Sequence, residues 1–500
     1  MKLTDEQQNV INSLQLGESL KVQAFAGTGK SSMLAEAFNE KMIKGIYVTF
    51  NKAAAEEMKA KFYNGAKADE TVFTSHSLAY RQVGKNYKLQ LQKKNYKNYD
   101  FLKLKTFHIG ALKFTPATQW SIILKSIHNL TSSGSEWITK DHICEAVGSY
   151  TYSEIEQHQV ADQLFPAVDE TVTRMCDKNQ TSLGISHDFY LWLWMRKIIT
   201  PESRMKFPYQ SLVVVDEAQD SNGSLLNLLV NLENQICFVG DAYQQIYEWR
   251  GARNAIQSLD LPEMVLSKSF RMTDKIAKIC EKIIGREIVG TDNPPDNIPG
   301  WGILCRRQFD VIKWVLTELD AGRTVALDNS YSGLFYDIEE MQRFRRGIIS
   351  KWDFYGTYDS LVAHISEFPD DEETKQIYLL EKFLTGLGIE PQDIKNKLTN
   401  PHYAEVEVST IHRAKGRQWQ SVDLDLALDR VSNPHTPEIQ KLIYVGCSRA
   451  SEDLDFPTKS DKDIMDEITP DYFIKEESVV TRIVKKRIEE EERPAAQAMF

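Results

Sequence analysis

The sequence QAFAGTGKSS, at residues 23–32, is typical of a turn that leads from a buried strand into a helix and binds phosphate. Gly27 and Gly29 allow a tight turn, and the backbone N–H groups of such a turn can surround phosphate oxygens at the start of the next helix. The spacing therefore predicts a Walker A loop within an α/β domain.

Individual roles in this loop follow from its geometry. Lys30 is expected to reach the β- and γ-phosphates, and the Ser31 hydroxyl is expected to hold Mg²⁺. Ala24 stands where the first glycine of the pattern is usual, and a chance glycine turn before a helix is the alternative. The loop predicts only a nucleoside triphosphate, held by Ala26, Gly27, Thr28, Gly29, Lys30, Ser31 and Ser32.

A pair of carboxylates follows a second apolar run, in VVVDEAQD at residues 213–220. Asp216 is placed to hold Mg²⁺, and Glu217 is placed to position or deprotonate an attacking water. Adjacent acids are also common on ordinary surfaces. Their place at the end of an apolar strand, in a chain with a phosphate loop, favours the catalytic interpretation.

Further apolar runs, each ending in polar residues or glycine, indicate buried parallel strands with functional groups at their carboxyl ends. They form two sets, one at 45–50, 211–220 and 235–241 and the other at 301–307, 324–328, 405–412 and 421–428. Two α/β domains are predicted. The long stretches that interrupt the two sets indicate inserted, mainly helical subdomains, since long structureless loops are uncommon.

Composition limits the class of protein. A chain of 500 residues needs several cores, and its net charge of −11 argues against binding polyanions through bulk charge. No long apolar run or secretory core is present, so we expect a cytoplasmic protein without a membrane partner. The six cysteines include no CxxC and suggest no disulfide framework or metal cluster.

One segment departs from this acidic balance. Between Arg81 and Lys125 there are ten lysines or arginines and one acid, Asp100, with aromatic residues interleaved. Cations mixed with rings are typical of a surface that binds single-stranded nucleic acid. A solvated basic helix pair whose aromatics form a core explains the pattern equally well.

The sequence VGDAYQQIYEWRGA, at residues 239–252, follows another predicted strand. Gln244 could sense a γ-phosphate, while the nearby Tyr247, Trp249 and Arg250 could contact a polynucleotide. A hydrophobic turn with a buried tryptophan is the alternative. In the first interpretation, one short segment contacts both the nucleotide and the polynucleotide, so it couples hydrolysis to movement along the nucleic acid.

In order and spacing, the motifs of this chain resemble those of the UvrD/Rep-type superfamily 1 DNA helicases. The similarity spans most of the chain. The motif sequences TFNK, HDFYLWLW, QQIY and SFR are most similar to those of the F-box DNA helicase branch, although no F-box is evident. The motifs are LTDEQ (3–7), AFAGTGKS (24–31), VTFNKAAAEEM (48–58), TSHSLAY (74–80), VVVDEAQDSN (213–222), VGDAYQQIYEWRGA (239–252), LSKSFR (266–271), ILCR (303–306), VSTIHRAKGRQW (408–419) and LIYVGCSRA (442–450).

The resemblance implies ATP and Mg²⁺ as cofactors and assigns further nucleotide contacts. Gln7 would read adenine, Gln244 would contact the γ-phosphate, and Gly416 would line the nucleotide site. Arg271 and Arg449 would act as arginine fingers from the second domain. Gln418 stands where relatives usually carry a glutamate, which implies a weaker ribose contact.

The resemblance also places DNA on residues of both domains. Rings would stack on bases without sequence preference, and polar groups would hold phosphates. The implied contacts are Phe50, Asn51, His76, Tyr247, Trp249, Arg250, Thr410 and His412.

The resemblance implies two RecA-like parallel-sheet P-loop domains. The first would comprise residues 1–80 and 186–262, with a helical insertion at 81–185 as a candidate DNA-channel wall. The second would comprise 263–330 and 402–470, with a small insertion at 331–401 and a C-terminal tail at 471–500.

The implied function is an ATP-dependent motor that tracks along single-stranded DNA from 3′ to 5′, unwinds duplex and meets single-strand/duplex junctions. It would take part in DNA repair, recombination or replication. Its expected location is the cytoplasm, in association with a nucleoid, or the nucleus of a eukaryote. Two alternatives stay open, a translocase that strips bound proteins with little unwinding and a nucleotide-gated DNA-binding partner of a nuclease. The tail is a candidate site for a protein partner.

Overall fold

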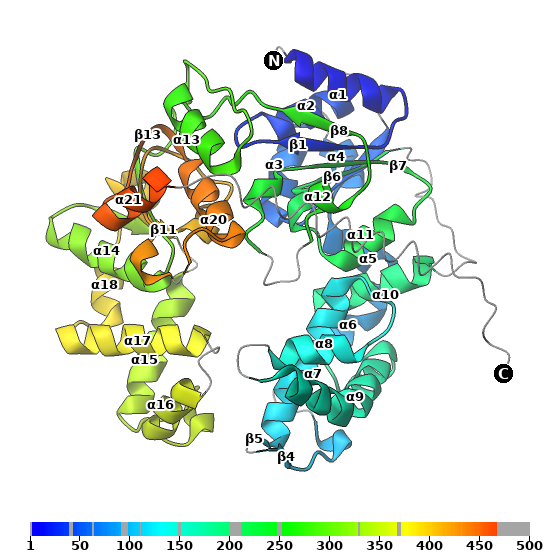
Figure 1. Ribbon diagram of the computed structural model, residues 1–500, viewed down its shortest axis with the longest axis vertical. Coiled ribbons are helices and arrows are strands. Elements are labelled where there is room, and N and C mark those ends of the chain that lie inside the picture. The colour runs from blue at the N-terminus through cyan, green and yellow to red at the C-terminus, as the bar shows by residue number, and fades with distance from the viewer. Residues whose placement is uncertain are drawn as a thin grey trace. The chain divides into compact units, whose positions relative to one another are not determined.

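The computed structural model describes residues 3–39, 44–62, 65–91, 99–110, 112–148, 152–199, 212–247, 253–328, 331–367, 372–431 and 433–467. The chain forms two compact units (Figure 1). The first comprises Met1–Phe25 and Gly29–Leu266, and the second comprises Ala26–Thr28 and Ser267–Phe500.

A parallel sheet is the centre of the first unit. Its strand order in the described residues is β3-β2-β6-β7-β1-β8. Thr49 pairs with Asp216, and Gln23 pairs with Gly240, so functional groups gather at one edge of the sheet. The strands are β1 (Leu20–Ala24), β2 (Gly45–Thr49), β3 (Val72–Thr74), β6 (Leu212–Asp216), β7 (Gln235–Gly240) and β8 (Glu263–Leu266).

Helices surround this sheet and share its apolar core, which includes Val22, Phe38 and Val214. The first helix begins with a capping box, in which the Thr4 hydroxyl accepts from the Gln7 N–H. The helices are α1 (Asp5–Gln15), α2 (Lys30–Asn39), α3 (Lys52–Ala60), α4 (Gly65–Thr71), α5 (Ser75–Gln82), η3 (Ala218–Asp220), α11 (Gly223–Val230), η4 (Ala242–Gln244) and α12 (Ala255–Ser258).

The segment between β3 and β6 is mainly helical, as the sequence predicts, and it adds one β-hairpin. Helices α7, α8 and α9 pack against one another, and α10 packs against α5, α7 and α11 (Figure 1). The elements are η1 (Gly84–Tyr87), α6 (Lys88–Leu91), η2 (Asp100–Leu102), β4 (Phe107–Ile109), β5 (Leu112–Phe114), α7 (Pro116–Ser133), α8 (Lys140–Val147), α9 (Glu154–Cys176) and α10 (His187–Ile199).

Rings of the basic segment contribute to the core of this insertion. Trp120 and Phe114 are 3% and 1% exposed, and Trp120 contacts the rings of Tyr99 and Phe101. Phe107 stacks on Phe114 with ring centroids 4.9 Å apart. Buried rings cannot stack on bases, so Trp120 and Phe114 favour the core interpretation, while the exposed lysines of the segment are unaffected by it.

The second unit has a parallel sheet of its own, with the order β10-β11-β9-β12-β13 in the described residues. Each neighbouring pair is parallel. The strands are β9 (Trp301–Cys305), β10 (Val325–Leu327), β11 (Val406–Thr410), β12 (Trp419–Asp425) and β13 (Ala450–Asp455). A second parallel α/β sheet confirms the predicted fold class.

The helices between β10 and β11 share one apolar core with this sheet, in which Val325, Val406 and Leu380 all lie. The predicted small insertion is therefore packed as part of the second unit. The helices of this unit are α13 (Asp274–Ile284), α14 (Gln308–Asp320), α15 (Tyr331–Arg345), η6 (Asp353–Tyr355), α16 (Tyr358–Glu367), α17 (Glu372–Leu387), α18 (Pro391–Lys397), η7 (Pro401–Tyr403), α19 (Ile411–Ala414), η8 (Leu428–Arg430), α20 (Pro437–Cys447) and α21 (Lys459–Glu467).

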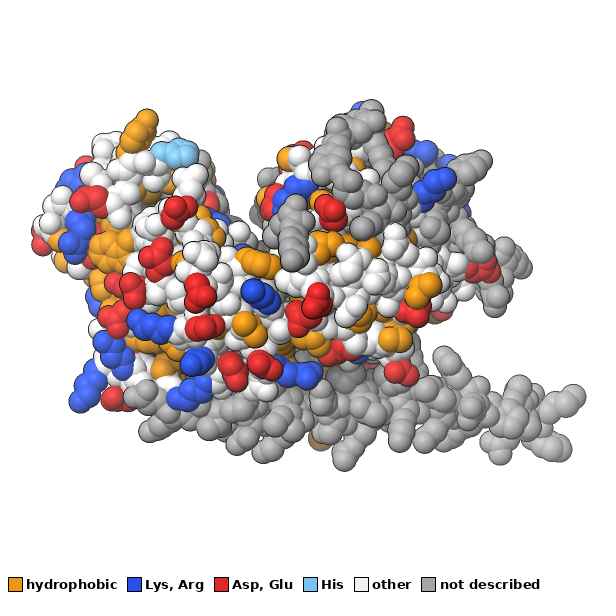
Figure 2. Space-filling model, turned by 90° about the horizontal axis from the view of Figure 1, so that it is seen from above, with side chains coloured by type: hydrophobic (Ala, Val, Ile, Leu, Met, Phe, Trp, Pro, Cys, Tyr) orange, Lys and Arg blue, Asp and Glu red, His pale blue; other side chains and the backbone are white. Residues whose placement is uncertain are grey.

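The surface carries charges of both signs. On the face shown in Figure 2, acidic and basic side chains are interspersed among the described residues. No helix in the described part of the chain is long and apolar enough to cross a membrane.

Candidate functional site

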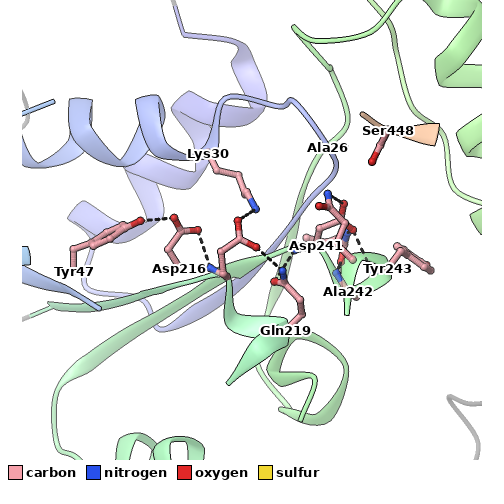
Figure 3. A network of polar contacts seen from close by, with 12 residues as sticks. Ala26, Lys30, Tyr47, Asp216, Gln219, Asp241, Ala242, Tyr243 and Ser448 are labelled. Carbon is pink, nitrogen blue, oxygen red and sulfur yellow. Dashed lines mark hydrogen bonds and ion pairs between the residues drawn. The ribbon is translucent and has the colours of Figure 1, made fainter. Parts of the chain in front are cut away.

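An ion pair joins the phosphate loop to the acidic strand end. Helix α2 begins at Lys30, and the Lys30 Nζ lies 3.0 Å from the Glu217 Oε1 (Figure 3). Glu217 follows β6 in the left-handed region, at φ 52°, which is uncommon for a residue other than glycine. This conformation marks a constrained turn at the end of the strand.

Burial and charge act in opposite directions on Lys30. Burial alone would lower the pKa of Lys30, but the carboxylates of Glu217, Asp216 and Asp241 together raise it above the ordinary value for lysine. Lys30 is therefore held in its cationic form, as a phosphate contact requires.

Asp216 is held by two donors. Its Oδ1 accepts the Glu217 N–H at 2.9 Å, and its Oδ2 accepts the hydroxyl of Tyr47, which lies in β2 (Figure 3). Burial raises the pKa of Asp216, and the nearby charge of Lys30 only partly offsets this. Sequence reasoning missed Tyr47, because a tyrosine in an apolar strand is usually a packing residue.

The oxygen groups around Asp216 fit a hard cation. Mg²⁺ prefers oxygen ligands and keeps several waters, so carboxylate and hydroxyl groups suit it. Thr49 is fully buried in the strand position that pairs with Asp216, and its hydroxyl has no hydrogen-bond partner within the described residues. Ser31 lies in the first turn of α2, half-buried.

A chain of amide contacts continues from Glu217 to the end of β7. Gln219 is fully buried, and its Nε2 donates to the Glu217 Oε2 at 2.5 Å. Its Oε1 accepts the Asp241 N–H at 3.1 Å. A Cβ on Gly240 would lie 2.2 Å from this Oε1, so only glycine permits the approach.

Asp241 holds the predicted phosphate sensor. The Gln244 Nε2 donates to the Asp241 Oδ2 at 2.7 Å, and the Gln244 N–H donates to the Asp241 carbonyl at 2.9 Å. Gln23, from β1, donates to the Asp241 Oδ1 at 3.0 Å. Hydrogen bonds and one ion pair thus connect Lys30 to Gln244 without a gap, although these residues come from separate strand ends.

The tip of the loop, Ala26–Thr28, belongs to the second unit. The Ser269 hydroxyl donates to the Ala26 carbonyl, and the Phe270 N–H donates to the Gly27 carbonyl, both at 2.8 Å. Gly27 has φ +77°, and a Cβ there would lie 2.4 Å from the Arg271 Cβ. Arg271 therefore lies beside a residue of the predicted phosphate loop.

Gln7, the predicted adenine contact, has a structural partner. It is 1% exposed, and its Oε1 accepts the Thr4 N–H at 3.0 Å in the capping box of α1. Its role toward adenine stays a prediction.

The second unit holds Arg449 in a fixed geometry. Arg449 is 1% exposed, and its guanidinium donates to the carbonyls of Val445 at 2.9 Å and Arg417 at 3.3 Å. Arg417 in turn pairs with the buried Glu407, next to Gly416 at φ +86°. The roles of Arg449 and Gly416 toward a nucleotide stay predictions.

Predicted DNA contacts of the first unit gather at the ends of β2 and β3. Phe50 is 37% exposed and meets the His76 ring edge-on at 5.7 Å. The His76 Nε2 lies 2.9 Å from the Asp188 Oδ1, and His76 also contacts the ring of His187 in α10. Asn51 caps α3 by accepting the Ala53 N–H at 2.8 Å.

The structure describes only some of the other residues predicted to contact DNA. Tyr247 is half-buried just after η4, whereas Trp249 and Arg250 lie outside the described residues. In the second unit, Thr410 is 5% exposed at the end of β11, and His412 is half-buried in α19. Their roles toward DNA stay predictions.

A parallel sheet with a phosphate-loop sequence after β1, a carboxylate pair at the end of β6 and a glutamine after β7 is typical of P-loop nucleotide-binding proteins. The family model for the UvrD/REP helicase N-terminal domain matches residues 3–260, more than half of the chain. The chain therefore belongs to the UvrD/REP helicase family.

Individual relatives are similar over most of the chain. It is 26% identical over 511 residues to F-box DNA helicase 1 of Gallus gallus, covering 90% of this chain and 48% of that protein. It is 24% identical over 519 residues to F-box DNA helicase protein 1 of Schizosaccharomyces pombe, covering 90% and 57%. ATP-dependent DNA helicase PcrA of Bacillus subtilis is 25% identical over 294 residues, covering 53% and 37%. The chain thus spans about half the length of these F-box helicases.

Proposed function

We propose that this protein is an ATP-dependent DNA helicase that moves along single-stranded DNA from 3′ to 5′ and unwinds duplex DNA. One observation carries the proposal: the unbroken contacts from Lys30 through Glu217, Gln219 and Asp241 to Gln244. Family membership supports DNA as the substrate, and the relatives' names include DNA helicases.

The ion pair between Lys30 and Glu217 gives the first step of the mechanism. An arriving phosphate competes with Glu217 for Lys30, because both are anions within reach of the same ammonium group. When Lys30 moves to the phosphate, the Glu217 carboxylate loses its cation and is free to accept a proton from the attacking water. Nucleotide binding thus prepares the base.

Asp216 and Ser31 are the residues that would hold Mg²⁺. A bound Mg²⁺ neutralises charge on the phosphate oxygens. Tyr47 fixes the Asp216 carboxylate by donating to its Oδ2, so that the carboxylate keeps one orientation. The ordered carboxylate lowers the cost of assembling the site.

Coupling to DNA is proposed to run through Gln244. This side chain is 6% exposed and tied to Asp241, and the predicted DNA contact Tyr247 follows it three residues later. Contact between a γ-phosphate and Gln244 would be transmitted along the backbone that leads from Gln244 to Tyr247. DNA affinity would then depend on the state of the nucleotide.

Arg271 and Arg449 are proposed to contact phosphates from the second unit. The carbonyls that accept from Arg449 hold its guanidinium in one conformation, which suits a cation that must act in one geometry. Phe50, His76, Thr410 and His412 are proposed to hold the single strand, and single-strand/duplex junctions are the proposed natural substrate.

Unwinding of duplexes with a single-stranded tail at either the 3′ or the 5′ end tests the proposal. We expect ATP-dependent unwinding only of the duplex with the 3′ tail, and none without ATP. ATP turnover on single-stranded DNA without unwinding would identify a protein-stripping translocase instead. ATP turnover that does not change when DNA is added would identify a nucleotide-gated binding protein. Either of these last two outcomes would contradict the helicase proposal.

A further inference from the structure

Gln23 is a polar residue in the middle of a buried parallel strand. Strand β1 lies between β7 and β8, and its flanking residues Val22 and Ala24 are fully buried. Gln23 itself is 3% exposed. A buried amide in such a strand costs free energy unless its donor and its acceptor are both used.

Both ends of the Gln23 amide contact the turn after β7. Its Nε2 donates to the Asp241 Oδ1 at 3.0 Å, and its Oε1 accepts the Ala242 N–H at 3.1 Å. The amide therefore spans two successive residues of the turn. Gln23 lies only a few residues before the phosphate loop, so β1 connects that loop to the turn directly.

The same turn holds Gln244. Asp241 Oδ1 accepts Gln23 and the Tyr243 N–H, whereas its Oδ2 accepts the Gln244 Nε2 at 2.7 Å. Loss of the Gln23 donor would remove one of the hydrogen bonds that orient the Asp241 carboxylate, and Gln244, which donates to that carboxylate, would be held less firmly. The orientation of Gln244 therefore depends on a side chain that makes no contact with Gln244 itself.

We propose that Gln23 is a positioning residue that locks the Asp241 turn and so places Gln244 for contact with the γ-phosphate. The inference rests on the proposed ATP-dependent function and deepens it. Gln23 acts through Asp241 and Gln244 and touches no substrate. Strand β1, which leads into the phosphate loop, thus helps to place the side chain that detects the γ-phosphate.

Two substitutions at Gln23 separate its contacts. Gln23→Met keeps the unbranched shape and removes both polar ends. Gln23→Glu keeps an acceptor for the Ala242 N–H but turns a second carboxylate toward Asp241. Gln119→Met is the matched control, because Gln119 is equally buried in α7 and its Nε2 donates to two backbone carbonyls, those of Lys105 and Phe114.

Hydrogen exchange tests the contact without any activity measurement. The Ala242 amide should exchange faster in Gln23→Met than in the parent protein and stay protected in Gln23→Glu. In Gln119→Met this amide should behave as in the parent. Equal protection of Ala242 in the parent and in Gln23→Met would overturn the proposed lock.

Steady-state kinetics test the positioning role. In both Gln23 variants we expect nucleotide affinity within about threefold of the parent and DNA-stimulated kcat reduced roughly 10- to 100-fold, since small misplacement of a reacting group has effects of this size. Gln119→Met should keep the parent kcat measured without DNA, which both Gln23 variants should lower. A residue with a merely structural role would lower the melting temperature and weaken nucleotide binding together, which would contradict the inference.

A double-mutant cycle with Gln244→Ala shows whether Gln23 acts through Gln244. Gln23→Met should have little further effect on kcat in the Gln244→Ala background, because the group it positions is gone. Additive effects would overturn the inference. A parent protein without DNA-stimulated ATP turnover would overturn the proposed function, whereas a normal parent with a normal Gln23→Met variant would overturn only the role of Gln23.

Discussion

Replacing Tyr47 with phenylalanine removes one hydroxyl from the centre of the candidate site. This hydroxyl donates to the Oδ2 of Asp216, which is 3% exposed. A hydrogen bond to a charged group contributes about 1.5–3 kcal/mol to stability, and the phenyl ring fills the same space. We therefore expect Tyr47→Phe to lower the free energy of unfolding at pH 7 by about this amount.

Thermal denaturation measures this loss. For a unit of roughly 150–250 residues, 1 kcal/mol shifts the melting temperature by about 2–4 °C, so the expected decrease is roughly 3–12 °C. Tyr87→Phe is the matched control, because the Tyr87 hydroxyl donates to the neutral Cys176 carbonyl at 2.8 Å and should contribute only about 0.5–1.5 kcal/mol.

A decrease in Tyr47→Phe no larger than that in Tyr87→Phe would refute the reasoning. A second readout is the Mg²⁺ concentration that gives half-maximal nucleotide binding. It should rise in Tyr47→Phe, since the Asp216 carboxylate loses its fixed orientation, and it should be unchanged in Tyr87→Phe.

Three further predictions concern other residues. Arg449→Ala should retain nucleotide binding and slow ATP hydrolysis about 10³- to 10⁵-fold, and a loss below about tenfold with an unchanged melting temperature would exclude a finger role. Burial alone would raise the pKa of Asp188, but the hydrogen bond and charge of His76 and the charges of two further histidines lower it below its ordinary value. Asp188 therefore stabilises the fold above the unfolded-state pKa of about 3.9, and this stabilisation is lost as the pH falls through the lower folded-state value. Chemical denaturation should thus show a smaller loss between about pH 4 and pH 2 in Asp188→Asn than in the parent, and parallel curves would contradict this sign. Lys93, Lys94 and Lys97 belong to the basic segment and lie outside the described residues. Replacing all three by glutamine should flatten the slope of log DNA affinity against log salt by up to about 2 units. An unchanged slope would support the interpretation of the segment as a solvated helix face.

The sequence predicted the strand ends of the candidate site because their chemistry is local. Glycines at 27 and 29 before Lys30, and two acids after an apolar run, specify a turn and a strand end without reference to the rest of the chain. The structure places Lys30 and Glu217 in an ion pair at 3.0 Å. All seven apolar runs that predicted strands overlap strands of the two parallel sheets.

What the sequence could not predict depends on register between distant strands. Tyr47 reaches Asp216 because β2 pairs with β6, and Gln23 reaches Asp241 because β1 pairs with β7. Nothing near Tyr47 in the sequence indicates that pairing. A glutamine between the buried Val22 and Ala24 was the one available signal for Gln23, and its partner could not be named without the sheet order.

The aromatic residues of the basic segment show a second limit. Alternating lysines and rings fit both a nucleic-acid surface and a core under a charged face, because burial is not a local property of the sequence. Burial of Trp120 and Phe114 assigns these two rings to the insertion's own interior. The charge of the segment still predicts contact with phosphates.

ATP turnover measured with and without single-stranded DNA, in the parent protein and in Lys30→Ala, tests the central claim most directly. We predict that single-stranded DNA increases turnover by the parent and that Lys30→Ala shows only background turnover under both conditions, while it retains much of the DNA binding. Turnover by the parent that does not respond to DNA, or turnover by Lys30→Ala equal to that of the parent, would contradict the claim.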